Sequence, residues 1–138
     1  MTKTIYLVRH GEYGYGRVLV RDGIEQIMAT SQIIRQELNE AGIERVAIYH
    51  SPQLRAKQSA EVMKAELRPA IVARLIQSEY LDLDCTQVHR LADIINEGVT
   101  TIFISHQPDL EDFADQADVS TFFPKGGFQK AVIRNCNF

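Results

Sequence analysis

Short, β-rich apolar runs alternate along the chain with longer stretches in which apolar residues recur every three or four positions. The short runs predict strands at residues 4–8, 46–49, 70–73, 101–104 and 129–134. The longer stretches predict helices at residues 24–38, 56–67, 88–95 and 110–117. Prolines at 52 and 108 are expected in the first turns of their helices, and glycines at 42 and 98 at helix ends. This alternation predicts a three-layer α/β sandwich, a mostly parallel sheet with helices on both faces.

Composition narrows the class of protein. The 138 residues, 45% of them hydrophobic, predict a single domain over 1–138 with a substantial core. Since 15 Lys and Arg face 18 Asp and Glu, a basic nucleic-acid-binding surface is not expected. No apolar run approaches membrane-spanning length, and residues 1–8 do not resemble a signal peptide. Cys85 and Cys136 form no CxxC pair, so we expect a cytoplasmic protein with no membrane partner. The sequence leaves its oligomeric state open.

Polar residues whose side chains can bind or attack a phosphate group follow three of the predicted strands. They are Arg9 and His10, then His50 and Ser51 with Arg55 just beyond, and then His106. The carboxyl ends of parallel strands share one sheet edge, where ligands bind. Each guanidinium offers a fork of donors that suits phosphate oxygens. A histidine beside them serves as a donor when protonated or as a nucleophile when neutral. The sequence therefore predicts an anion site at this edge.

Three ordered motifs extend this prediction. Residues 7–12 (LVRHGE) resemble the RHG signature of the histidine phosphatase, or phosphoglycerate mutase-like, superfamily. Residues 51–60 (SPQLRAKQSA) are similar to its second motif, SPLxRAxQTA, and residues 104–110 (ISHQPDL) to its third, VGHNPDL. One such motif is weak evidence, but three in the family's order, each at a strand end, are specific. The resemblance covers nearly the whole chain and implies a phosphoglycerate mutase-like fold.

The resemblance implies catalytic roles for four residues. His10 would attack phosphorus and carry a transient phosphoryl group, which water then removes. Arg9, Arg55 and His106 would hold the equatorial oxygens, where the transition-state charge is stabilised. No metal or other cofactor is implied, because these side chains supply the positive charge. The four histidines of the chain also lack metal-ligand spacing.

The length of the chain and one departure from the family's sequence pattern indicate the class of substrate. At 138 residues the chain resembles the short SixA-type phosphohistidine phosphatases, which lack the insertions that cap mutase active sites. Larger members place a glutamate as general acid where this sequence has Gln77, and an amide cannot protonate a leaving alkoxide. Phosphohistidine leaves as an imidazole and needs no such acid. We therefore expect phosphohistidine on a protein as substrate, with a small phosphorylated molecule as the alternative.

Other assignments stay open at this level. Gly11, Ser51, Gln77 and Glu79 are further candidates for substrate binding. Glu79, or an aspartate at 82 or 84, could act as acid in a broader phosphomonoesterase. A non-catalytic phosphate-binding module is the rival from another class. His50 could line the rim of the pocket or be structural, and residues 13–16 could form a mobile loop over the pocket or a tight turn with two surface tyrosines.

Overall fold

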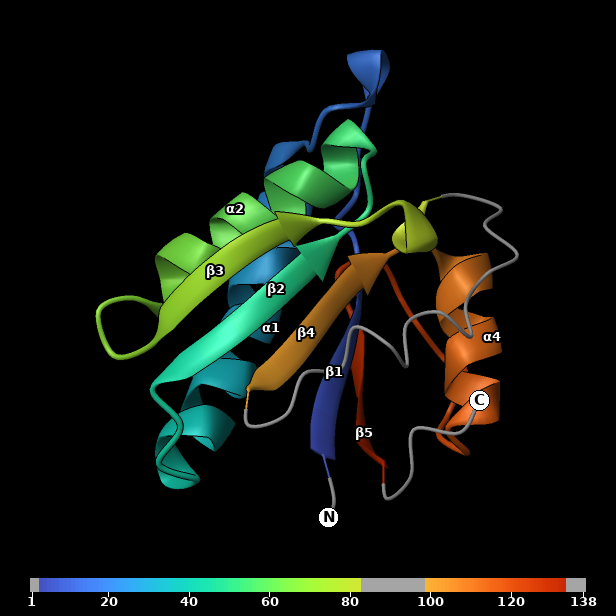
Figure 1. The fold of residues 1–138 in the computed structure, drawn as a ribbon. Helices are drawn as coiled ribbons and strands as arrows, with labels where there is room; N and C mark the ends of the chain where they lie inside the picture. Colours follow the sequence, from blue (N-terminus) through green and yellow to red (C-terminus); the bar gives the residue numbers. More distant parts are fainter. Residues whose placement is uncertain (1–2, 83–98, 134–138) are drawn as a thin grey trace.

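The computed structural model describes residues 3–82 and 99–133 (Figure 1). The strands are β1 (Lys3–Arg9), β2 (Arg45–His50), β3 (Val72–Gln77), β4 (Thr100–Ser105) and β5 (Phe128–Ile133). The helices are α1 (Arg21–Glu40), α2 (Leu54–Leu67) and α4 (Gln107–Gln116), with 3₁₀ turns η1 (Tyr15–Arg17) and η2 (Glu79–Leu81). The helix predicted at 88–95, both cysteines and Asp84 lie outside the described residues.

The five strands form one sheet in the order β3-β2-β4-β1-β5. The pairs β3–β2, β2–β4 and β4–β1 are parallel, and β5 runs antiparallel to β1. Arg9 of β1 is paired with Ser105 of β4, and His50 of β2 with Ile104 of β4. The carboxyl ends of β1, β4 and β2 therefore lie side by side at one edge, as the sequence predicts.

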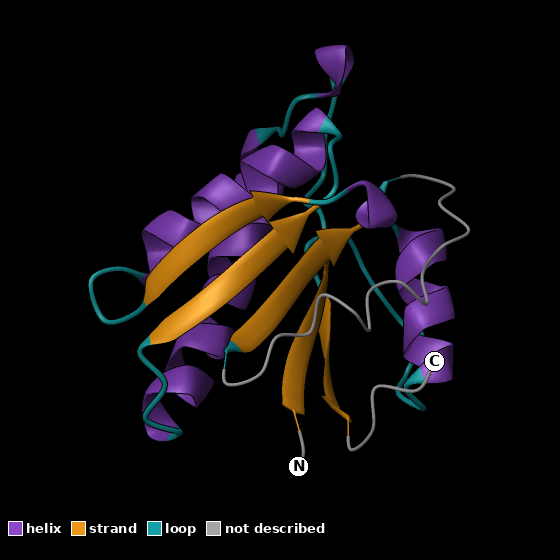
Figure 2. Ribbon diagram, in the orientation of Figure 1, coloured by secondary structure: helices purple, strands orange, loops and turns teal. Residues whose placement is uncertain are grey.

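Helices cover both faces of the sheet, α1 and α2 on one face and α4 on the other (Figures 1 and 2). Successive side chains of a strand point to opposite faces, so one apolar run supplies both cores. In β1, Ile5 and Leu7 pack in a cluster with Phe113 of α4, whereas Tyr6 and Val8 join the cluster beneath α1 and α2. Burying each such side chain stabilises the fold by about 1.5–3 kcal/mol. The predicted three-layer α/β sandwich is confirmed.

Two predicted boundaries are wrong. The third strand, predicted at 70–73, begins at Val72 and ends at Gln77, in register with the whole of β2. β3 is an edge strand whose exposed and buried positions partly alternate. The continuous apolar run at 70–73 therefore gave a stronger strand signal than β3 itself, and the prediction placed the strand too early. α2 begins at Leu54, so Pro52 lies in the turn before the helix and not in its first turn. Within the described ranges, no helix is long and apolar enough to cross a membrane.

Candidate active site

The carboxyl edge of the sheet brings together the four side chains that the sequence singles out. The rings of His10 and His106 lie edge to face with their centroids 5.2 Å apart. Nη2 of Arg55, in the first turn of α2, lies 3.4 Å from Nδ1 of His106. Arg9 donates from Nη1 to the carbonyl of Phe123 at 3.0 Å, and its positive charge acts on both imidazoles. Two histidines and two arginines thus form one cluster.

Three of the four side chains of this cluster are buried, and both arginines carry a donor without a partner among the described residues. His10, Arg55 and His106 are 4%, 6% and 2% exposed. The buried Nε atoms of Arg9 and Arg55 have no hydrogen-bond partner within the described part of the chain. Buried N–H groups are normally satisfied, and an arginine fork matches two oxygens of a phosphate. The arrangement therefore fits a tetrahedral oxyanion bound between the two guanidinium groups.

His10 is held in the form that a nucleophile needs. Its Nδ1 donates to the carbonyl of Gly11 at 2.9 Å, so the neutral ring carries its lone pair on Nε2. Burial, opposed by this hydrogen bond and reinforced by the positive charges of Arg55 and Arg9, lowers the pKa of His10 to about 4. At pH 7 the ring is neutral, and Nε2 is free to attack an electrophile.

His106 adopts the opposite tautomer, because an arginine can only donate. Nδ1 of His106 accepts from Arg55, so the proton of the neutral ring lies on Nε2, 2.8 Å from Oγ of Ser51. The backbone N–H of Gln53 donates to the same Oγ at 3.2 Å. Burial, with the positive charges of His10 and Arg55, lowers the pKa of His106 to about 4. Ser51, a candidate for substrate binding, thus orients His106.

Gly11 also has a positioning role. Its N–H donates to Oγ of Ser59 at 3.0 Å, so this amide is already engaged. A Cβ at Gly11 would collide with the carbonyl oxygen of Gly23 in the first turn of α1. The glycine therefore allows the loop after β1 to lie against α1, which fixes the backbone that holds His10.

Tyr13 is a site residue that the sequence analysis did not assign. Its ring lies edge to face with His10 at 5.5 Å, and Cζ of Arg55 lies 4.6 Å from the ring centroid. Nζ of Lys125 lies 5.9 Å from the same centroid and 3.6 Å from Oε1 of Glu12. An aromatic face attracts cations, so Tyr13 holds Arg55 in the cluster. The only sequence signal was its place directly after the LVRHGE motif.

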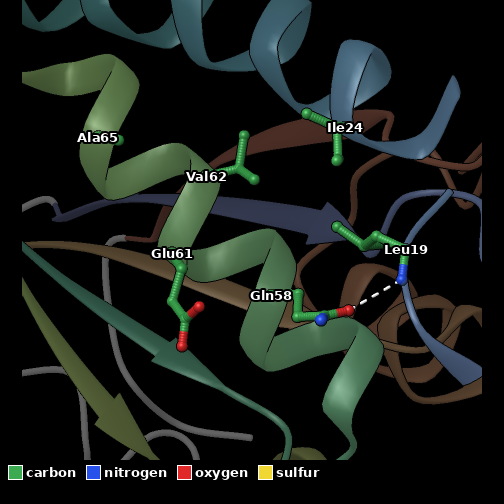
Figure 3. Close-up of a pocket in the computed structure, with 6 residues that line it drawn as sticks. All are labelled: Leu19, Ile24, Gln58, Glu61, Val62 and Ala65. Carbon is green, nitrogen blue, oxygen red and sulfur yellow. Dashed lines mark hydrogen bonds between the residues drawn. The ribbon is translucent and has the colours of Figure 1, made fainter. Parts of the chain in front are cut away.

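The segment that carries Tyr13 is anchored to α2 by a hydrogen bond. Tyr13 and Leu19 form an isolated antiparallel β-bridge. The N–H of Leu19 donates to Oε1 of Gln58 in α2 at 2.8 Å (Figure 3). Figure 3 shows the hollow beside this contact, which is lined by Leu19, Ile24, Gln58, Glu61, Val62 and Ala65. Of the two alternatives for residues 13–16, the structure favours a tight turn, closed by a 2.9 Å hydrogen bond from the N–H of Arg17 to the carbonyl of Gly14.

The four remaining candidates lie in different surroundings. Gln77 ends β3 and is exposed, and Glu79 is exposed in η2. Asp82, half-buried, accepts from Nε2 of Gln53 at 2.9 Å, and its negative charge acts on His106. His50 is buried, and its Nδ1 donates to the carbonyl of Ser51 at 2.9 Å, which supports the structural alternative. The structure thus places Asp82, rather than Glu79, in electrostatic contact with the cluster.

Over residues 3–82 and 99–133, no group of three His, Cys, Asp or Glu side chains is arranged to hold a metal ion. Within the described site, Arg9 and Arg55 carry positive charge. A bound oxyanion would be stabilised by Arg9 and Arg55 directly, and it would favour protonation of His106 at Nδ1. The site thus combines donors that suit an anion with an unprotonated ring nitrogen.

The two buried histidines make the stability of the fold depend on pH. The pKa of each is about 4 in the folded chain, against about 6.5 when unfolded. Between these values the unfolded chain binds more protons, so the free energy of unfolding falls as the pH drops from 6.5 to 4. We expect a slope of about 1.4 kcal/mol per pH unit for each histidine in this window. Urea unfolding at pH 7, 6 and 5 measures it, and replacing both histidines by glutamine should flatten it. An unchanged slope in that double variant would contradict the assignment.

The sheet order and the layers of helices are those of the phosphoglycerate mutase-like fold. The chain is similar to the protein histidine phosphatase SixA complexed with tungstate, with 20% identity over 92% of this chain and 93% of that one, at a TM-score of 0.68. It is also similar to a phosphoglycerate mutase from Plasmodium falciparum (20% identity, 93% and 85% covered, TM-score 0.68). A mycobacterial glucosyl-3-phosphoglycerate phosphatase in complex with VO3 is a third similar structure (11% identity, 93% and 90% covered, TM-score 0.64).

These likenesses confirm the fold that the three motifs imply. No protein-family model matches the sequence, and no curated protein matches it. The roles of the individual side chains therefore depend on the geometry described above.

Proposed function

We propose that this protein is a phosphatase that hydrolyses the phosphoryl group of protein phosphohistidine through a phospho-His10 intermediate. The observation that carries the proposal is the hydrogen bond from Nδ1 of His10 to the carbonyl of Gly11, made beside two arginines whose buried Nε atoms have no hydrogen-bond partner within the described residues. It leaves an unprotonated Nε2 at an anion site, which suits nucleophilic attack on phosphorus. The similar fold of a protein histidine phosphatase supports the same conclusion.

The first step transfers the phosphoryl group to His10. The lone pair on Nε2 attacks phosphorus in line, and the bond between phosphorus and the departing nitrogen breaks, its electron pair going to that nitrogen. Arg9, Arg55 and protonated His106 donate to the equatorial oxygens, where negative charge is stabilised in the transition state. The departing imidazole already carries a proton on its other nitrogen, so it leaves as a neutral molecule and requires no general acid.

The second step returns the enzyme to its starting state. A water oxygen attacks phosphorus in line, and the bond between phosphorus and Nε2 of His10 breaks. His10 keeps its proton on Nδ1 and regains the Nε2 lone pair, while both water protons leave with the product as dihydrogen phosphate. The hydrogen bond to Gly11 holds the ring in the same tautomer before and after the cycle.

The substrate class is tested by comparing two leaving groups. We expect rapid phosphate release from a phosphohistidine-bearing protein and much slower release from an alkyl phosphate, whose alkoxide leaves poorly without an acid. Release would be measured for both substrates at the same enzyme concentration. Comparable rates would mean that an acid acts and that the protein is a broader phosphomonoesterase. No release from either would favour a phosphate-binding module.

The second candidate, ester hydrolysis, makes its own prediction about the acid. Glu79 is exposed, whereas Asp82 is half-buried and acts on His106. We therefore expect Glu79→Gln to leave alkyl phosphate turnover within about twofold of wild type, as for other exposed substitutions away from the chemistry. Asp82→Asn, the matched variant, should lower turnover of the ester more than turnover of phosphohistidine. A sharp loss in Glu79→Gln with none in Asp82→Asn would reverse this assignment.

A further inference from the structure

The described residues expose their two most accessible large apolar side chains at the same edge as the active site. Tyr15 is fully exposed and Phe122 is 71% exposed. Leu54, 45% exposed, is the first residue of α2. We call Tyr15, Leu54 and Phe122 the apolar rim. Exposed aromatic side chains near a polar site are typical of surfaces that bind proteins.

Each rim residue lies one or two positions along the chain from a residue that belongs to the site or contacts it. Leu54 directly precedes Arg55. Phe122 precedes Phe123, whose carbonyl accepts from Arg9 at 3.0 Å. Tyr15 follows two residues after Tyr13, whose ring contacts His10 and Arg55. Three separate segments therefore carry an exposed apolar side chain within two residues of a group that belongs to or contacts the anion site.

The backbone at these positions is held in place. The N–H of Gly14 donates to the carbonyl of Val18 at 3.0 Å, which closes the turn that carries Tyr15 at the projecting end of the fold (Figure 1). The carbonyl of Phe122 accepts from Nε2 of Gln129 at 2.8 Å. Side chains on an ordered backbone lose less conformational entropy on binding than those on a mobile one.

We propose that the apolar rim is the docking surface for the phosphorylated protein, and that it recognises apolar residues flanking the phosphohistidine. The inference rests on the proposed function. When a phosphorylated side chain enters the site, the chain on either side of it is brought onto the surrounding surface. A small phosphorylated metabolite, once bound between Arg9 and Arg55, has no groups that extend to Tyr15 and Phe122.

The test uses two synthetic peptides that carry the same non-hydrolysable phosphohistidine analogue, a triazole phosphonate. One peptide has Leu and Phe beside the analogue and the other has Ser at both positions. We expect the apolar peptide to bind about five- to tenfold more tightly, as partial burial of two aromatic side chains predicts. Calorimetric titration measures both affinities.

Rim variants identify the source of the preference. Tyr15→Ser combined with Phe122→Ser should remove the preference for the apolar peptide while leaving turnover of N-phosphoimidazole unchanged. Val132→Ser is the matched control, because Val132 is 55% exposed but is paired with Thr4, near the opposite edge of the sheet. It should keep the preference.

The outcomes separate this inference from the proposed function. Equal affinities for the two peptides, or a preference that survives in the double variant, overturn the docking surface even if N-phosphoimidazole is hydrolysed. A preference that depends on the rim, found together with no hydrolysis of N-phosphoimidazole, overturns the phosphatase and leaves the docking surface standing.

Discussion

Replacing His10 by asparagine is expected to lower phosphate release from phosphohistidine by about three orders of magnitude or more, as loss of a covalent nucleophile does elsewhere. The reason is specific to Nε2. No other described group of the cluster combines an unprotonated nitrogen with a tautomer fixed by a backbone carbonyl, as the bond to Gly11 fixes His10. Steady-state release of phosphate, with thermal unfolding as a check on folding, measures the effect.

His50 provides an unusually close control for this variant. Like His10 it follows the pattern of a buried histidine at the end of a strand, with Nδ1 donating to the next carbonyl at 2.9 Å. It differs in having no assigned part in the chemistry. His50→Asn should therefore keep its activity apart from any loss of stability, whereas His10→Asn should not.

Trapping the intermediate distinguishes the nucleophile from a binding residue. Wild type and His50→Asn, quenched after mixing with labelled phosphohistidine protein, should both carry an acid-labile phosphoryl group, and His10→Asn should carry none. If label appears on His10→Asn, another group is the nucleophile. If wild type carries no label under rapid quenching and releases no phosphate, the site binds phosphate without turnover.

Replacing Arg55 by alanine is expected to have the second-largest effect, a loss of about 10²–10³-fold in kcat/KM, as for removal of a preorganised donor to a developing charge. Arg55 is 6% exposed, lies 3.4 Å from Nδ1 of His106 and stacks against Tyr13. Its buried Nε has no partner among the described residues, so this donor is available to the phosphoryl oxygens. Arg55→Lys should not restore activity, because an ammonium lacks the planar fork.

The pH profile gives this variant a second readout. The positive charge of Arg55 is one cause of the low pKa of His10, so its removal should move that pKa upward from about 4. The acid limb of kcat/KM, where His10 becomes protonated, should then shift to higher pH. Arg74→Ala, which removes an exposed arginine from β3, is the matched control and should change neither quantity. An Arg55→Ala profile identical to wild type would contradict the placement of this charge beside His10.

The strands and helices in the described ranges follow closely from local patterns. The β-branched run at 4–8 and the helical spacing from Ile24 to Leu38 predicted β1 and α1, because burial on a sheet or on one helix face imposes those periods. β3 was misplaced for a physical reason. An edge strand buries less of each residue, so its sequence VARLIQ carries a weaker apolar signal than the run that precedes it.

The residues of the candidate site could be predicted from short motifs, whereas their geometry could not. Arg9, His10, Arg55 and His106 could be named from the sequence because each lies in a recognisable pattern at a strand end. The tautomers of the two histidines depend on what lies across from each ring, a backbone carbonyl for one and an arginine for the other. No local pattern contains that information.

By itself the sequence determined the class of fold, the edge of the sheet where the candidate anion site lies and the four side chains that meet there. Only the tertiary structure decided how those side chains act. It brought Tyr13 against His10 and Arg55, placed Asp82 rather than Glu79 in electrostatic contact with His106, and left Tyr15 and Phe122 exposed. The physical reason is that periodicity records how each segment buries its own apolar face, whereas pKa values, tautomers and docking surfaces depend on contacts between segments far apart in the chain.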